Sequence, residues 1–484
     1  MRSLYIHSRT TEQVGVVMEQ NDIREVFLDR PTANSLVGNI YVGRVRNIEK
    51  GLQAAFVDVG LDRLGFLQLR ELPKGRQNPT YSIENVITEG EKILVQIIKD
   101  PFGEKGAMLT ANITIPGVNL VFLPFGAYIA ASKKLPETSR TPIVNQLKAI
   151  KQGEEGAIVR TSAPESALTE IESEYGLLKQ RWQQIVSSAK QVTTPTRLFE
   201  DHLIPDKLLR RFSPSSIEVV YVDDSSLAND LRKRHPVLSK RIKWKKETEA
   251  LLPYTIPQLY EYLVRKKVQV SGGANLHIDQ AEALTVIDVN SSSFTKHLSK
   301  NQTMIRTNMN AAIEAAKQIR LRNLSGMIII DFIRMSTEGD REKVRYTLEQ
   351  ELAKDPVRTE VYGFTKLGLL EMTRKRETPD LPYLLLGSQA NAIHPFSHET
   401  TAYILEREIV SYQMKQVEVL IIELHPNVYE RFLHNIRDNM KDVTLDVYMI
   451  QNEYIDSFQV KHAGSQSVIE QQVKETSYPI DKVF

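Results

Sequence analysis

Two apolar runs in the second half of the chain each end abruptly in an aspartate. The first covers residues 283–287 and leads into Asp288, and the second covers residues 327–330 and leads into Asp331. Both are rich in β-branched residues, which predicts strands buried on both faces. Between them an amphipathic helix is predicted over 302–321. Its apolar face is Ile305, Met309, Ala312, Ile313, Ala316 and Ile319.

A strand, a crossover helix and a second strand predict two parallel neighbours. Parallel strands end at the same edge of a sheet, so we expect Asp288 and Asp331 to converge there. With the nearby amide of Asn290 they form a donor set that suits a hard cation such as magnesium. In the competing interpretation the aspartates cap turns or helices and the asparagine forms a turn. The residues alone leave both open.

Short runs in which apolar and polar residues alternate dominate the first part of the chain. Runs within residues 1–34 predict an antiparallel meander that pairs with a later segment. Roughly five short strands with glycines between them, over residues 35–111, predict a small OB-type barrel. Phe56 and Phe66 lie on either side of a turn at residues 58–63. They either stack bases on the outer wall, as OB folds do, or belong to the core.

The middle of the chain changes character. Ile115–Pro124 and Glu154–Thr161 predict strands, and residues 166–189 predict a helix. The apolar stripe of this helix is Leu168, Ile171, Tyr175, Leu178, Trp182 and Ile185. By themselves, Arg160 and Thr161 fit a strand end followed by a turn.

Further elements complete the pattern. A helix is predicted at 206–211 and a strand at 217–222, and Asp223 and Asp224 after that strand are interpreted as loop residues. Loop-like sequence follows Pro379 up to residue 395. The final α/β unit contains a helix at 399–413, a strand at 417–424, a helix opening at His425 and a strand at 443–448.

Composition narrows the class of protein. At 484 residues the chain is too long for a single hydrophobic core, and roughly three or more domains are expected. Hydrophobic residues at 41% and charged residues at 25% are typical of soluble globular proteins. No apolar run approaches the roughly 20 residues of a membrane span, and the start resembles a strand rather than a signal peptide. The absence of cysteine excludes disulfides and thiolate zinc sites. We therefore expect a cytoplasmic protein without membrane contact.

Positive charge is sorted locally although the net charge is only +2. Residues 231–246 carry eight basic side chains and no acid, and smaller basic clusters occupy 265–267 and 374–376. Such clusters either follow the backbone of a polyanion or form solvated surface.

Several longer motifs carry a resemblance to a known family. Gly38–Val45, Gly51–Asp58 and Gly65–Leu67 resemble the RNA-binding OB domain of the ribonuclease E/G family. Residues 283–291 (ALTVIDVNS), 330–333 (IDFI) and 368–374 (GLLEMTR) are similar, in the same order, to its DNase I-like catalytic subdomain.

The resemblance implies a multidomain α/β and α+β fold. An RNase H-like subdomain would comprise residues 1–34 and 206–265. Inserted within it would be an OB-fold domain at 35–111 and a 5′-sensor region at 112–205. A DNase I-like catalytic subdomain at 266–378, a linker at 379–395 and a small domain at 396–484 would follow.

The resemblance also implies an activity, which is magnesium-dependent endonucleolytic cleavage of single-stranded mRNA, rRNA or tRNA precursors. The products would carry a 5′-phosphate and a 3′-hydroxyl, and substrates with 5′-monophosphorylated ends would be preferred. Asp288 and Asp331 would hold one Mg²⁺ per catalytic site, while Asn290 orients the scissile phosphate. RNA would contact Phe56, Phe66 and Lys105.

A pocket for the 5′-monophosphate would be formed by Gly117, Val121, Arg160 and Thr161. Guanidinium and hydroxyl donors suit a terminal phosphate. A glycine lets the main chain approach closely.

The chain also departs from the family pattern. Relatives often join two subunits through a zinc held by a Cys-x-x-Cys pair, so here we expect no zinc and a homo-oligomer, a dimer, formed without it. We expect no scaffolding role either, because the long partner-binding tail of the largest relatives is missing. Arg334 stands where relatives usually carry an acid. It favours the alternative of a non-catalytic, ribosome-associated RNA-binding protein, whereas Asp288, Asn290 and Asp331 argue against it.

Overall fold

The computed structural model describes residues 1–33, 35–101, 104–281, 284–291, 300–387, 396–466 and 480–484. The chain divides into two compact units, of which the first contains residues 1–6 and 33–246 and the second contains 7–32 and 247–484. Ala283 and the last part of the predicted linker, 388–395, lie outside the described residues. The domain boundaries inferred from the sequence stay predictions.

A closed five-stranded barrel forms one part of the first unit. Its strands are β4 (Ile40–Glu49), β5 (Ala54–Asp58), β6 (Gly65–Gln68), β8 (Met108–Thr110) and β7 (Lys92–Lys99), in that order. Pairing of β7 with β4 closes it. The core includes Val57, Leu67 and Leu109. Gly65 is required there because a Cβ would collide with the Leu109 side chain. The five predicted strands are confirmed, and the OB assignment stays a prediction.

A second sheet of the first unit has the order β11-β12-β10-β9. The strands are β9 (Ile115–Pro116), β10 (Leu120–Leu123), β11 (Ile129–Ala131) and β12 (Gly156–Val159), with helices α2 (Glu137–Ile150) and α3 (Leu168–Gln191). The prediction of one continuous strand over 115–124 is wrong. The chain reverses at Gly117, whose N–H donates to the Leu120 carbonyl at 2.8 Å, and β9 and β10 form a hairpin.

A parallel group of strands completes the first unit. The strands are β1 (Arg2–His7), β14 (Ile217–Val222) and β15 (Ile242–Trp244), with β1 pairing with β14 and β14 with β15. This confirms that the N-terminal segment pairs with a later one. The predicted helix at 206–211 is largely confirmed, because a π-helical turn at Leu203–Lys207 leads directly into α4 (Leu208–Arg210). Asp224 accepts the Leu227 N–H as the N-cap of α5 (Ser225–Arg234).

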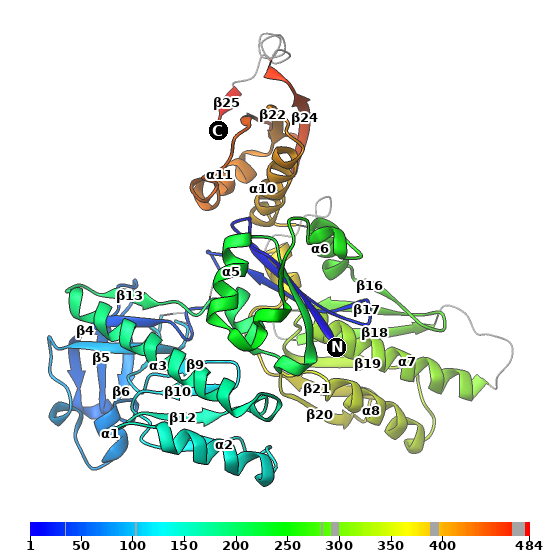
Figure 1. Cartoon of the computed structure of the whole chain (residues 1–484). Helices are drawn as coiled ribbons and strands as arrows, with labels where there is room; N and C mark the ends of the chain where they lie inside the picture. Colours follow the sequence, from blue (N-terminus) through cyan, green and yellow to red (C-terminus); the bar gives the residue numbers. More distant parts are fainter. Residues whose placement is uncertain (34, 102–103, 282–283, 292–299, 388–395, 467–479) are drawn as a thin grey trace. The chain divides into compact units, whose positions relative to one another are not determined.

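A six-stranded sheet of order β16-β17-β18-β19-β21-β20 lies in the second unit. Its strands are β16 (Lys267–Val270), β17 (Ala274–Gln280), β18 (Leu284–Ser291), β19 (Gly326–Asp331), β20 (Thr359–Phe364) and β21 (Leu369–Arg374). The helices α7 (Lys300–Leu321) and α8 (Glu338–Leu352) pack on one face (Figure 1). As predicted, β18 and β19 are parallel neighbours.

Burial of these strands on both faces, predicted from their apolar runs, is wrong. Val286 is 37% exposed and Met327 is 52% exposed, because the two helices cover only the face that carries Ile287 and Ile328. The predicted apolar face of α7 is also partly wrong, since Ile313 is 42% exposed.

The rest of the second unit is a hairpin and a small α/β part. The hairpin joins β2 (Gln13–Glu19) to β3 (Asp22–Asp29), and the short helices α6 (Ile256–Val264) and α9 (Leu381–Leu386) belong to the same unit. The C-terminal sheet has the order β24-β22-β23-β25. Its elements are α10 (His398–Met414), β22 (Val419–Leu424), α11 (Pro426–Asn435), β23 (Asp446–Gln451), β24 (Phe458–Gly464) and β25 (Ile480–Lys482).

The predicted start of α11 is confirmed, because the His425 ring accepts the Asn427 N–H as the N-cap. The strand expected at 443–448 begins at Asp446 instead. None of the helices in the described part of the chain is long and apolar enough to cross a membrane.

Candidate functional site

Asp288 and Asp331 are direct register partners on the parallel strands β18 and β19. Side chains alternate along a strand, and Ile287 and Ile330 face the helix-packed core. The two aspartates therefore lie on the opposite, helix-free face of the sheet. Asp288 is half-buried and Asp331 is exposed. The predicted placement of the two aspartates side by side on parallel strands is confirmed, and their convergence on one ion stays a prediction.

Asn290 lies two residues beyond Asp288 and shares its face of the sheet. Its Nδ2 donates a hydrogen bond of 2.5 Å to Asp288 Oδ2. Across from Asp288, on β17, is His277, whose Nε2 is 3.0 Å from Asp279 Oδ2. His277 thus has a partner of its own.

The donor set fits a magnesium ion. Among the described residues no cluster of three or more histidine, cysteine, aspartate or glutamate side chains has the geometry of a metal cage. Mg²⁺ does not require such a cage, because it keeps several waters and commonly uses one or two carboxylates. Asp288 and Asp331 provide two.

Glu371 is a carboxylate that the sequence analysis did not single out. On β21, Leu369 is opposite Asp331 and Glu371 is opposite Ile329. Glu371 is exposed and shares the face of Asp331. The alternation of apolar Leu370 and Met372 with polar Glu371 and Thr373 was the available signal. Arg334, three residues beyond Asp331, is also exposed.

Phe56 and Phe66 are opposite each other on β5 and β6 of the barrel. Their ring centroids are 5.7 Å apart with planes inclined by 59°. Both are half-buried, whereas the adjacent Ala55, Val57 and Leu67 are buried in the barrel core. The two rings therefore lie on the outer wall, and Lys105 is exposed.

The four residues matched to a phosphate pocket lie in or directly beside one sheet of the first unit, with Gly117 in the turn between β9 and β10 and Val121 on β10. Arg160 follows β12, and its Nη1 donates to the Gly117 carbonyl at 2.9 Å and to the Arg210 carbonyl at 3.2 Å. Val121 is paired with Ile158 of β12, and Thr161 is exposed. The structure thus brings Gly117 and Arg160 into direct contact. Burial, and then the neighbouring Arg210 guanidinium, lower the pKa of Arg160.

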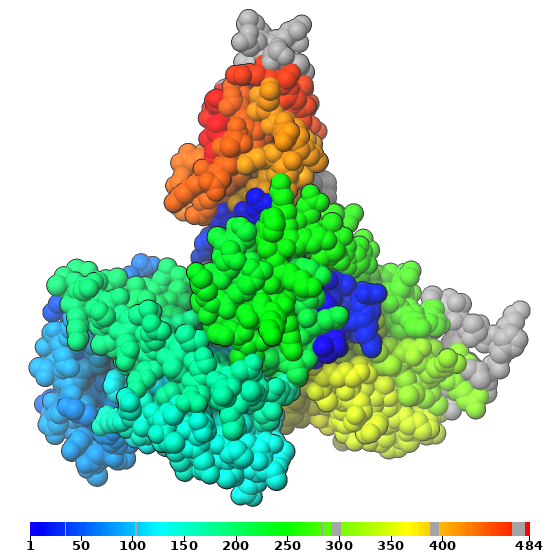
Figure 2. Space-filling view, viewed as in Figure 1, coloured from blue at the N-terminus to red at the C-terminus, as the bar shows by residue number. Residues whose placement is uncertain are grey.

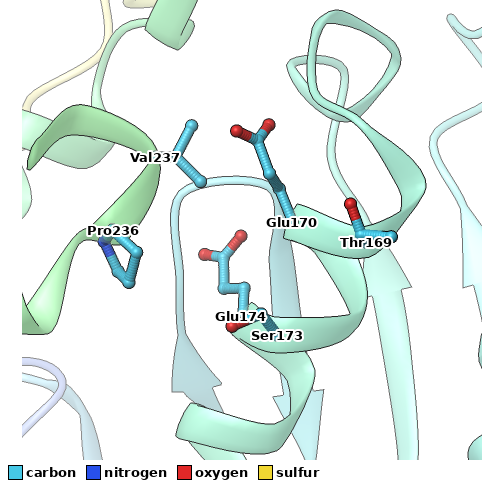
Figure 3. A pocket seen from close by; sticks show the side chains of 6 residues that line it. All are labelled: Thr169, Glu170, Ser173, Glu174, Pro236 and Val237. Carbon is cyan, nitrogen blue, oxygen red and sulfur yellow. The ribbon is translucent and has the colours of Figure 1, made fainter. Parts of the chain in front are cut away.

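Beside these residues the first unit has a small pocket of about 160 Å³. Thr169, Glu170, Ser173 and Glu174 of α3 line one side, and Pro236 and Val237 line the other (Figure 3). The carboxylates of Glu170 and Glu174 therefore line this pocket.

Two of the basic clusters are only partly exposed. Arg374 is buried, and its Nε lies 2.8 Å from Asp355 Oδ2. It is therefore a structural residue, and its cluster at 374–376 is smaller than the sequence indicated. In the 231–246 segment Arg232 donates to the Ile242 carbonyl and Arg234 pairs with Asp206. The lysines of this segment are exposed: Lys233, Lys240, Lys243, Lys245 and Lys246.

Comparison with known proteins agrees with this arrangement. A model described as the ribonuclease E/G family matches residues 114–377. Ribonuclease G of Escherichia coli is 32% identical over 411 residues, covering 80% of this chain and 83% of that protein. Ribonuclease G of Haemophilus influenzae is 31% identical over 438 residues, covering 86% and 89%. Ribonuclease E of a Nostoc species is 32% identical over 403 residues, covering 80% of this chain and 57% of that protein.

The fold and the site together define a multidomain α/β protein with a closed barrel and an acid-bearing mixed sheet. With relatives of this identity and coverage, the chain belongs to the ribonuclease E/G family.

Proposed function

We propose that the protein is a magnesium-dependent endoribonuclease that cleaves single-stranded RNA during RNA processing and decay. The observation that carries the proposal is the direct register of Asp288 with Asp331 on an uncovered sheet face. Membership in a family whose relatives are named ribonucleases supplies the substrate class. Products with a 5′-phosphate and a 3′-hydroxyl belong to the same proposal.

Asp288 and Asp331 would hold the Mg²⁺. When bound, the ion polarises a phosphate oxygen and lowers the pKa of a coordinated water. Asn290 would orient the scissile phosphate beside the two carboxylates. Its hydrogen bond to Asp288 supports this role, because it fixes the amide next to the metal ligand. Glu371, on the same face, is a further polar group near the reacting phosphate.

Single-stranded RNA would be held by exposed rings and lysines. The rings of Phe56 and Phe66 on the outer wall of the barrel would stack on bases, and the positive charge of Lys105 would bind the phosphate backbone. In the 231–246 segment arginines hold the fold together while lysines remain in solvent, where they can contact phosphates. The green α5 region of this segment is at the surface in the space-filling view (Figure 2).

We further propose that Gly117, Val121, Arg160 and Thr161 recognise a 5′-monophosphate. The contact of the Arg160 guanidinium with the Gly117 carbonyl supports a shared pocket. We also propose a cytoplasmic homodimer that forms without zinc, and light scattering on the purified protein would measure its mass.

Cleavage of a short 5′-monophosphorylated RNA tests the catalytic assignment. We expect Asp288→Asn and Asp331→Asn each to lower kcat by at least about 100-fold, because each removes an anionic ligand of the ion that stabilises transition-state charge. Chelation of Mg²⁺ should stop the parent enzyme. Glu351→Gln on α8, on the covered face of the sheet, is the matched control and should retain activity.

Equal cleavage by all variants would refute the catalytic site. RNA binding without any cleavage by the parent protein would instead support the non-catalytic alternative, for which the exposed Arg334 beside Asp331 is the structural argument.

The 5′-end preference tests the sensor separately. The ratio of kcat/KM for 5′-monophosphate over 5′-hydroxyl RNA should fall toward one in Arg160→Ala, because the phosphate loses a charged donor. Arg140→Ala, a half-buried arginine on α2, should keep the parent ratio. A parent-like ratio in Arg160→Ala would contradict the sensor assignment.

A further inference from the structure

Glu174 is a carboxylate on the buried side of helix α3. It follows Ile171 by three residues and precedes Leu178 by four, and both of these are in the core. Its own exposed fraction is 9%. Burial raises the pKa of Glu174, and the N–H groups of Asn119 and Val118 oppose that rise. A charged side chain at such a position requires partners, since burying it unpaired is costly.

The partners of Glu174 are backbone amides of the turn between β9 and β10. Its carboxylate accepts the N–H of Val118, and it accepts the N–H of Asn119 at 3.1 and 3.2 Å. The carboxylate also approaches the turn so closely that a Cβ at Gly117 would collide with Glu174 Oε1. The close approach of Glu174, together with that of Leu178, therefore accounts for a glycine at position 117.

The same turn is tied to the strand end that carries Arg160. The Arg160 N–H donates to the Asn119 carbonyl at 2.8 Å, and the Arg160 guanidinium donates to the Gly117 carbonyl at 2.9 Å. Ser162 Oγ donates to the Val118 carbonyl at 2.9 Å. The carbonyls of Gly117, Val118 and Asn119 thus each receive a donor from residues 160–162, while Glu174 holds the Val118 and Asn119 amides.

We propose that Glu174 is the positioning residue of the 5′-phosphate pocket: by holding the Val118 and Asn119 amides it fixes the Gly117 carbonyl that aims the Arg160 guanidinium. The inference rests on the proposed sensor and adds the residue that sets its geometry. Glu174 acts through the turn and through Arg160, and it does not touch the phosphate.

The geometry separates Glu174 from the other residues of the pocket beside it. Figure 3 shows Glu170 and Glu174 on successive turns of α3, with Pro236 and Val237 across the pocket. Glu170 accepts the Ala167 N–H at the start of the helix and is exposed. Ser173, next to Glu174, lines the same pocket and provides a control that leaves the turn intact.

The test measures 5′-end preference in full-length Glu174→Ala and Glu174→Gln. Alanine removes both acceptor oxygens, so the ratio of kcat/KM for 5′-monophosphate over 5′-hydroxyl RNA should fall toward one. The loss should appear in KM for the monophosphate substrate, while cleavage of 5′-hydroxyl RNA stays at the parent rate. Glutamine keeps one acceptor oxygen, so its ratio should lie between those of alanine and the parent.

Ser173→Ala should keep the parent ratio, and Arg160→Ala shows whether the sensor exists. A lost preference in Arg160→Ala with a parent ratio in Glu174→Ala overturns the inference and leaves the sensor standing. An unchanged ratio in Arg160→Ala refutes the sensor itself. Equal loss on both substrates in the Glu174 variants assigns only a folding role and also overturns the inference. If Glu174→Ala does not fold, Glu174→Gln decides: a ratio at the parent value overturns the inference.

Discussion

Burial decides what individual charged side chains do in this protein. Arg374 looks in the sequence like a member of a basic surface cluster. In the fold it is 3% exposed, pairs with Asp355, and donates to Asn323 Oδ1 at 2.8 Å. Lys243 and Lys245, by contrast, are exposed. Arginine suits the buried position because its planar fork makes several directed hydrogen bonds, whereas lysine is a strongly hydrated point charge.

Glu406 on α10 is a residue whose burial produces a pH dependence. It is 2% exposed, and its Oε1 accepts the N–H and the hydroxyl of Thr11 at 2.8 and 2.9 Å. Among the described residues, its Oε2 has no hydrogen-bond partner. Burial raises the pKa of Glu406 to about 7, against the lowering effects of the Thr11 hydrogen bonds and Arg407. Between about pH 4.5 and 7, Glu406 is therefore protonated in the folded protein and ionised in the unfolded chain.

Because the folded state binds the extra proton, stability should fall as the pH rises from about 4.5 through 7. Over this pH range the free energy of unfolding should fall by about 3 kcal/mol, at 1.36 kcal/mol per pKa unit. Glu406→Gln should flatten this part of the profile, as measured by urea unfolding at a series of pH values. Glu408→Gln on the same helix is the control and should keep the parent slope. A parent slope in Glu406→Gln would show that other groups set the pH dependence.

At the scale of elements, periodicity predicted most helices and strands but not every reversal of the chain. The run Ile115–Pro124 has the composition of one strand, and a local hydrogen bond at Gly117 divides it into two. The glycine alone does not indicate this turn, because the side chains that exclude a Cβ at this position, Glu174 and Leu178, are distant in sequence. The core-facing side of α7 was also only partly predicted, since small alanines such as Ala311 and Ala315 face the sheet while Ile313 does not.

The wall formed by β5 and β6 gives a prediction about RNA binding. Phe56→Ala should weaken binding of a single-stranded oligonucleotide by about 1–3 kcal/mol, the usual value of one base–aromatic stack. The barrel should stay folded, because Phe56 is half-buried and lies outside the barrel core. Fluorescence anisotropy at fixed salt measures the affinity, and circular dichroism checks the fold. Tyr128→Ala, a 39% exposed aromatic elsewhere in the same unit, is the matched control. Equal losses in both variants would contradict a specific role for the β5–β6 wall.

At the scale of the whole molecule, the two compact units are not continuous stretches of the chain. Residues 7–32 belong to the second unit although more than 200 residues separate them from the rest of it. A buried ionic group explains this placement. Arg30 Nε is 2.5 Å from Glu12 Oε2, and Glu12 Oε1 is 3.5 Å from Arg407. The Tyr260 hydroxyl donates to Glu12, and Arg30 donates to the Leu384 carbonyl at 2.9 Å.

Removing one member of this group should destabilise the second unit strongly. Arg30→Met should cost about 3–5 kcal/mol, because it leaves Glu12 buried without its nearest cation. Lys482→Met, which breaks the exposed pair with Asp446, should cost less than about 1 kcal/mol. Urea unfolding followed by circular dichroism measures both. Similar midpoints for the two variants would mean that the buried group does not hold the hairpin in the second unit.

The sequence by itself determined the local elements and the pair of aspartates at parallel strand ends. This was possible because side-chain periodicity and strand–helix–strand order are local properties that the sequence displays directly. Only the tertiary structure decided which sheet face is uncovered, which arginines are buried, and that Glu174 holds the Gly117 turn. Those outcomes depend on contacts between residues that are distant in sequence, such as Glu174 with Val118 and Arg374 with Asn323.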